Sequence, residues 1–230
     1  MSNHRFMRRA AKGLLFSSIA FSASSYASSY YNCANATGCV AVPSLTATSD
    51  FAKTKYPIVL AHGLGGWSKM FGLVDYFNGI PQDLTKNGAS VYVTKTSSVN
   101  DTEVRGEQLL QQVKTIIAIT GSPKVNLIGH SQGGIDIRYV AGVAPSLVSS
   151  VTAISSPEQG SKMADWTVKM VTEGSAADGL PAGEFNTASL MAIKFFELVG
   201  GAMDIGSGVP LNQLQQQDGW AAVNSLTTNY

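Results

Sequence analysis

The chain has 230 residues, of which 44% are hydrophobic and 13% are charged, and its formal net charge is +1. This length and composition fit one globular domain with a buried core and exclude a disordered or fibrous chain. A charge near zero, without a basic stripe or a phosphate-binding Gly-Lys-Ser/Thr loop, argues against nucleic acid as a partner.

The first 27 residues predict an export signal. A basic start that includes Arg5, Arg8 and Arg9 precedes a short apolar run over 13–21, and residues 25–27 are Ser-Tyr-Ala, a pattern that signal peptidases cleave after. The alternative is a membrane anchor, but the apolar run is well short of the roughly 20 residues that a bilayer span needs. We therefore expect a cleaved signal peptide over 1–27 and a secreted protein with no transmembrane segment.

Residues 28–52 are rich in Ser, Thr, Ala and Asn and predict an irregular N-terminal arm. The arm contains both cysteines, Cys33 and Cys39. No histidine pair lies near them, which argues against a zinc site. In an oxidising compartment we expect them to form one small disulfide loop, and the alternative is two free thiols.

An alternation of strands and helices begins after residue 53. Short apolar or β-branched runs predict strands, and segments with helical spacing of apolar residues predict helices. A glycine or a Gly-Ser-Pro break ends two of these helices. The pattern predicts a three-layer α/β domain over 53–230, with a mostly parallel central sheet that is incomplete on its C-terminal side. The predicted strands cover 56–61, 90–94, 125–128 and 151–154, and the predicted helices cover 81–87, about 101–120 and 133–143.

The regular alternation stops after Pro157. Residues 171–188 are mixed in character and contain Gly and Pro. Residues 189–199 predict an amphipathic helix, with Met191, Phe195 and Leu198 on one face. A further short helix is predicted over 211–223.

A nucleophile motif lies between a predicted strand and a predicted helix. Gly129-His130-Ser131-Gln132-Gly133 fits the G-x-S-x-G pattern, in which a sharp turn presents the serine hydroxyl above the sheet. The two flanking glycines remove side chains where the strand and the helix nearly touch. A chance match in a glycine-rich chain is the alternative, but the strand before the motif and the helix after it favour Ser131 as a catalytic nucleophile.

A glycine-rich loop follows the first strong strand. An acyl hydrolase needs two backbone N–H groups that point at the oxyanion of the tetrahedral intermediate. Gln132, the residue after the nucleophile, supplies one of them, and Leu64 is the natural source of the other. Gly63 and its neighbours let that backbone turn inward, although a plain glycine-rich turn would have the same composition.

Several runs in this chain resemble the true bacterial lipases of the Pseudomonas and Burkholderia type. They are 56–63, 104–109, 125–134 and 137–140. The resemblance implies the α/β-hydrolase fold and a triacylglycerol lipase that acts on lipid esters at an oil–water interface without an organic cofactor. It also suggests secretion through the periplasm, a lipase-specific foldase as partner, and a lid at about 171–208, for which an ordinary core-facing helix is the alternative.

The chain also departs from that family. These enzymes place the triad Asp and then the His after the serine, but the three histidines, His4, His62 and His130, all precede Ser131. Asp136 and Asp165 are poor candidates for the triad acid. We therefore expect a truncated sequence, with the triad Asp and His beyond residue 230. The family's structural calcium site would also lie there, so no metal is expected in these 230 residues.

Two further departures concern particular positions, and two other functions stay open. The cysteine pair stands early in the chain, and Glu158-Gln159 replaces basic or His residues in a family loop. Without a base, the protein could be a non-catalytic, hydrolase-like protein that binds lipid or a partner. A short-chain esterase or an acyltransferase is the second alternative.

Overall fold

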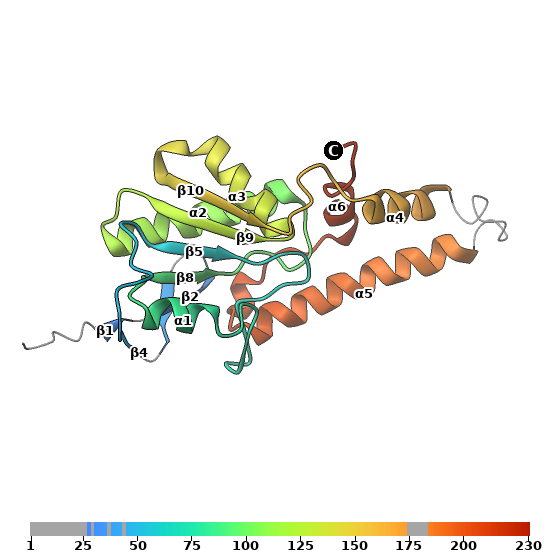
Figure 1. The fold of residues 1–230 in the computed structure, drawn as a ribbon. Helices are drawn as coiled ribbons and strands as arrows, with labels where there is room; N and C mark the ends of the chain where they lie inside the picture. The colour runs from blue at the N-terminus through green and yellow to red at the C-terminus, as the bar shows by residue number, and fades with distance from the viewer. Residues whose placement is uncertain (1–26, 29, 36–37, 43–44, 174–183) are drawn as a thin grey trace, which may run out of the picture.

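A computed structural model of the chain describes residues 27–28, 30–35, 38–42, 45–173 and 184–230 (Figure 1). The predicted signal peptide therefore lies almost wholly outside the described residues, as does part of the predicted lid region. No helix in the described ranges is long and apolar enough to span a membrane.

The central sheet has six strands in the order β10-β9-β5-β8-β2-β3. All neighbouring pairs are parallel except β2 with β3. This arrangement confirms the predicted, mainly parallel α/β fold. The strands of this sheet are β2 (Tyr30–Asn35), β3 (Gly38–Ala41), β5 (Ile58–Ala61), β8 (Val91–Thr94), β9 (Val125–His130) and β10 (Val148–Ile154). Two small pairs lie outside it, β1 (Ala27–Ser28) with β4 (Leu45–Thr46) and β6 (Lys69–Met70) with β7 (Val74–Asp75).

Helices cover the two faces of the sheet and make three layers. On one face, α2 (Thr102–Thr120) and α3 (Gln132–Val143) pack buried apolar side chains such as Leu109 and Ile137 against Val59 and Leu127 of the strands. On the other face, α1 (Ile80–Lys86) and the segment around Phe77 cover β5, β8 and β2. The second face is less covered toward β10.

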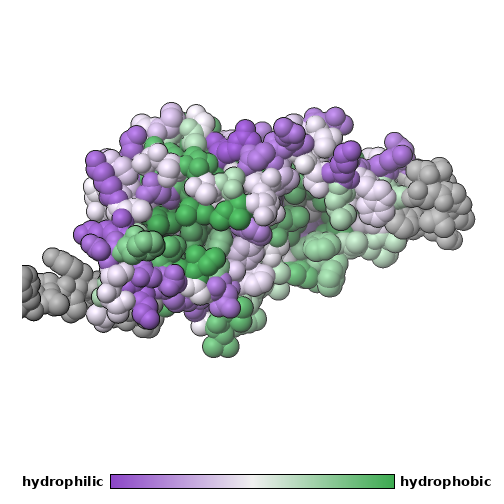
Figure 2. All heavy atoms as spheres, in the orientation of Figure 1, coloured by the Kyte–Doolittle hydropathy of each residue, from purple (hydrophilic) through white to green (hydrophobic). Residues whose placement is uncertain are grey.

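Strand β10 forms an edge of the sheet and is exposed along almost its whole length. Val151 is 40% exposed and Ile154 is 45% exposed, although both are β-branched residues typical of buried strands. Figure 2 shows apolar residues gathered over this part of the sheet. An apolar, unpaired edge strand is a surface on which further chain can pair.

The N-terminal arm is not irregular, contrary to the prediction. Residues 30–35 form β2, which pairs in parallel with β8, and β3 turns back along it. Composition hid this strand because its residues follow no regular alternation of apolar and polar types, and Tyr30 and Cys33 are buried on opposite faces of the sheet. Cys33 and Cys39 form a disulfide across the hairpin, as predicted.

The C-terminal part contains three α-helices beside the carboxyl ends of the strands (Figure 1). They are α4 (Lys162–Glu173), α5 (Glu184–Gly206) and α6 (Gly219–Asn224). The short segments Pro145–Leu147 (η1) and Leu211–Gln213 (η3) are 3₁₀ turns. The helix predicted over 211–223 is therefore confirmed only at its end, where α6 lies, and is wrong over its first part. Tertiary hydrogen bonds override the helical spacing, because Gln215 and Gln217 bond to Asp204 of α5.

Candidate active site

Ser131 occupies the turn between β9 and α3. Its backbone has φ 56° and ψ −128°, a region that non-glycine residues rarely adopt. The Ser131 N–H donates to the carbonyl of Ile154 on the neighbouring strand, with N and O 2.9 Å apart, so the turn is tied to the carboxyl end of the sheet. Strain of this kind persists only where the surrounding structure imposes it, and it gathers at functional sites.

Two glycines let the strand, the turn and the helix close on one another. A β-carbon on Gly129 would lie 2.1 Å from the carbonyl oxygen of Gly133, and one on Gly133 would lie 2.4 Å from that of Ala61. Neither position could accept a side chain without moving backbone. The sequence motif is thus explained by close packing at both of its glycines.

The His62–Gly66 loop lies directly against Ser131. A β-carbon on Gly63 would come within 2.7 Å of the Ser131 β-carbon and 3.2 Å of its hydroxyl oxygen. No backbone carbonyl among the described residues accepts from the Leu64 N–H. Gln132 is the first residue of α3, whose N–H has no partner within the helix. The structure therefore brings together the serine, the loop and the helix start that the sequence singled out.

His62 is buried and acts as a part of this loop. Its Nδ1 lies 2.9 Å from the carbonyl oxygen of Gly63, and its Nε2 accepts from the N–H of Thr96. These two partners require a neutral imidazole with the proton on Nδ1. Burial, together with the nearby cations of Arg105 and Lys95, holds the pKa of His62 well below its usual value of 6.5.

The lowered pKa of His62 predicts a loss of stability in mild acid. Below pH 6.5 the unfolded chain binds a proton at this histidine before the folded protein does, so the free energy of unfolding falls by up to about 1.4 kcal/mol per pH unit. Between pH 7 and pH 5.5, urea unfolding should show a loss about 1 kcal/mol larger for the parent than for His62→Gln. Equal losses in the two proteins would contradict this role.

His130 is hydrogen-bonded to Tyr76 and not to Ser131. Its Nδ1 lies 2.6 Å from the hydroxyl of Tyr76, and the same hydroxyl accepts from the Gly63 N–H at 3.2 Å. Tyr76 therefore joins the turn to the His62–Gly66 loop. Neither His62 nor His130 makes a hydrogen bond to Ser131, so no described histidine is placed to act as its base.

A buried ion pair between Arg105 and Asp136 is hydrogen-bonded to the His62–Gly66 loop. Arg105 of α2 donates from Nε and Nη2 to Asp136 of α3, and its Nη2 also donates to the carbonyl of His62 at 2.7 Å. Arg105 Nη1 donates to the carbonyl of Ser97. Both ionic side chains are buried, and burial raises the pKa of Asp136 to about 6 although the Arg105 cation opposes the shift. The guanidinium thus fixes one side of the loop.

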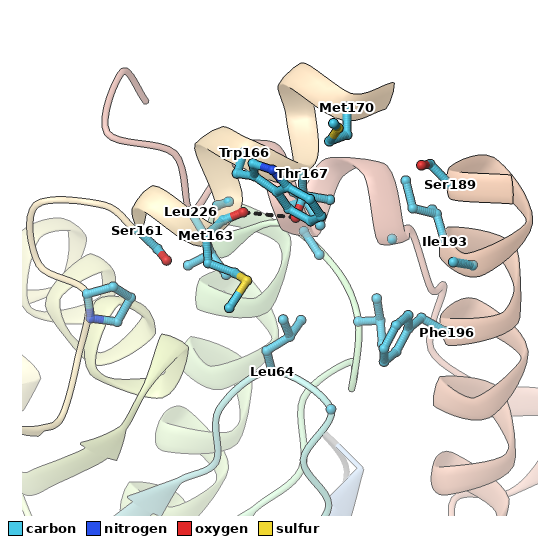
Figure 3. Close-up of a pocket in the computed structure, with 18 of the residues that line it drawn as sticks. Leu64, Ser161, Met163, Trp166, Thr167, Met170, Ser189, Ile193, Phe196 and Leu226 are labelled. Carbon is cyan, nitrogen blue, oxygen red and sulfur yellow. Dashed lines mark hydrogen bonds between the residues drawn. The ribbon is translucent and has the colours of Figure 1, made fainter. Parts of the chain in front are cut away.

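A largely apolar cavity of about 810 Å³ opens beside Ser131. Figure 3 shows Leu64 on one side of it, Met163 and Trp166 of α4 above, and Ile193 and Phe196 of α5 opposite. Ser131 and Ser155 contribute polar atoms to its lining. A cavity of this size and polarity can take a long hydrocarbon chain.

The apolar face predicted for the helix over 189–199 is exposed to solvent and does not turn toward the cavity. Met191, Phe195 and Leu198 are 68%, 63% and 72% exposed, whereas Ala192, Ile193 and Phe196 line the cavity. An ordinary core-facing helix would bury the first set. The structure instead gives α5 one side toward the cavity and large apolar side chains toward solvent.

Asp136 and Asp165, the two carboxylates considered as the triad acid, are both bonded to groups other than a histidine. Asp136 pairs with Arg105, and Asp165 in the first turn of α4 accepts from Thr228 through both carboxylate oxygens. Across the described ranges, no three His, Cys, Asp or Glu side chains come together as metal ligands, so no metal site is assigned to them. The sequence missed Arg105 and Tyr76 because most of the partners that join them to the site lie more than ten residues away along the chain.

Comparison with known proteins identifies the family of this chain. The family model described as alpha/beta hydrolase fold matches residues 56–196. The chain belongs to this family. A solved structure of a Bacillus licheniformis lipase in its propeptide form is similar with a TM-score of 0.50, at 24% identity over 78% of this chain and 31% of that chain, which shows the shared fold alone.

Two relatives are more similar in sequence, and both are named triacylglycerol lipases. The one from Vibrio cholerae is 46% identical over 178 residues, which is 77% of this chain and 52% of that protein. The one from Burkholderia plantarii is 41% identical over 191 residues, which is 82% of this chain and 49% of that protein. The α/β hydrolase chain described here thus spans about half the length of these relatives.

Proposed function

We propose that this chain is the nucleophile-bearing part of a secreted triacylglycerol lipase. The observation that carries the proposal is the strained turn that holds Ser131 between the His62–Gly66 loop and the apolar cavity. Such a constellation suits acyl transfer from a long-chain ester. The names of the Vibrio and Burkholderia relatives support the same substrate class.

In the proposed mechanism, the Ser131 oxygen attacks the ester carbonyl carbon and the carbonyl oxygen gains the negative charge. The N–H groups of Leu64 and Gln132 donate to this oxyanion. The C–O bond to the alcohol then breaks, the alcohol takes the proton that left Ser131, and an acyl-enzyme remains. Water attacks the acyl-enzyme, releases the fatty acid and restores the serine hydroxyl.

The proton transfers require a base that the described histidines do not supply. We propose that a histidine and its acidic partner reach Ser131 from a segment outside these 230 residues. The exposed edge of β10 supports this part of the proposal, because a further parallel strand that pairs there would end beside the carboxyl end of β10, to which the Ser131 turn is hydrogen-bonded. We propose in addition that a structural calcium site like that of the family lies in the same outside segment and that a lipase-specific foldase is a partner.

Export fits the Cys33–Cys39 disulfide, since such bonds persist in oxidising compartments. We propose that the protein passes through the periplasm and is secreted. The exposed apolar side chains of α5 then meet a lipid surface beside the cavity mouth, which is the arrangement that a lid would need.

Chain-length preference separates this function from a short-chain esterase or acyltransferase. The protein, expressed with its own downstream sequence, should hydrolyse dodecanoate esters with a higher kcat/KM than butyrate esters. Ala192→Trp would narrow the cavity and should lower kcat/KM for dodecanoate at least about tenfold while changing butyrate little. Leu198→Trp, on the exposed side of α5, is the matched control. A parent protein that prefers butyrate would contradict the lipase assignment.

A further inference from the structure

Lys95, just after β8, is fully buried together with its ionic partner. Its Nζ lies 2.5 Å from Oδ1 of Asp204 in the last turn of α5, and it also donates to the carbonyl of Thr96 and the hydroxyl of Ser98. Burial lowers the pKa of Lys95 to about 8 even though Asp204 opposes the shift. Burying an ammonium group costs desolvation free energy, so the contacts that hold Lys95 inside the protein have to offset that cost.

The other carboxylate oxygen of Asp204, Oδ2, is hydrogen-bonded to the segment that follows α5. It accepts from the backbone N–H of Gln215 and from the side-chain amide of Gln217, both at 3.0 Å. The amide oxygen of Gln217 in turn accepts from the Val99 N–H at 2.8 Å. The C-terminal end of α5 is thus joined to residues 95–99 at two points.

Residues 96 and 98, from the same segment as Lys95, are hydrogen-bonded to the His62–Gly66 loop. The Ser98 hydroxyl donates to the carbonyl of Gly66, and the Ser98 carbonyl accepts from the Gly65 N–H, both at 2.7 Å. Thr96 donates its N–H to His62 at 3.2 Å. Leu64 lies between these attachments, so the direction of its N–H depends on where residues 96–98 are held.

We propose that Lys95 is a positioning residue that couples the C-terminal end of α5 to the His62–Gly66 loop. The chain of contacts runs from Asp204 through Lys95 and Ser98 to the loop. The placement of α5 along the cavity and the direction of the Leu64 N–H then change together. The significance of that N–H rests on the proposed function, but the coupling itself does not.

Hydrogen exchange on the full-length protein tests the coupling without any catalysis. Asp204→Asn removes the charge at α5 and keeps the side-chain volume. The amides of Gly65 and Thr96 should then exchange about tenfold faster or more, because hydrogen bonds that depend on the Lys95 ammonium are weakened. The amides of β5 and of the middle of α2 should exchange as in the parent.

The double variant Lys95→Met/Asp204→Leu separates positioning from simple stabilisation. Replacing a buried ion pair by apolar residues often restores or raises stability. If Lys95 positions the loop, Gly65 and Thr96 stay fast in the double variant even where its urea midpoint equals that of the parent. Parent-like exchange of these two amides in the double variant would overturn the proposal. So would an Asp204→Asn effect spread equally over β5 and α2.

Discussion

Replacing Arg105 with methionine is expected to lower the free energy of unfolding by about 3–5 kcal/mol. The substitution leaves the Asp136 carboxylate buried without its partner and removes the donors to the carbonyls of His62 and Ser97. Urea unfolding at pH 8 measures the loss. At pH 5 the loss should be smaller, because a carboxyl whose pKa is already about 6 takes up a proton when its cation is removed.

An exposed ion pair provides the matched control for Arg105. Arg138 of α3 contacts Glu158 with side chains that are 54% and 33% exposed. Exposed pairs contribute about 0–1 kcal/mol, so Arg138→Met should change stability little. If the two substitutions lowered stability equally, Arg105 would not be the support of the loop that the structure indicates.

The parts of the fold that the sequence predicted are those set by local pattern. Strands β5, β8 and β9 are apolar runs, and the helix predicted over about 101–120 is α2, which Asp101 caps by accepting from the Val104 N–H. The turn at Ser131 was also predictable from the G-x-S-x-G motif, although only the clash at Gly129, with Gly133, is local, and the clash at Gly133 is with Ala61 of β5. Local signals of this kind do not depend on where the rest of the chain goes.

The parts that the sequence did not predict depend on distant partners. β2 is a strand because β8 offers it a parallel edge, which no property of the Ser- and Asn-rich arm reveals. Residues 214–218 have helical spacing but are extended, since Asp204 and Lys95 bind their amides. Arg105 and Lys95 would each be assigned to the surface by residue type, and only the folded chain shows the carboxylates that hold them inside.

Replacing Ser131 with alanine is expected to have the largest effect on function. In serine hydrolases, loss of the nucleophile lowers kcat by about 10⁶, because the remaining groups can only bind the substrate and stabilise its oxyanion. The rate of dodecanoate ester hydrolysis by the protein with its downstream sequence measures this. Ser155→Ala is the matched control, since Ser155 also has a positive φ of 48° and lines the same cavity.

Covalent labelling by a long-chain alkyl phosphonate, located by mass spectrometry, tests most directly whether Ser131 is the nucleophile. The protein with its downstream sequence should carry the phosphonate on Ser131. Ser155→Ala should label as the parent does, and Ser131→Ala should not label. A phosphonate on another serine, or ester hydrolysis that survives in Ser131→Ala, would contradict the account.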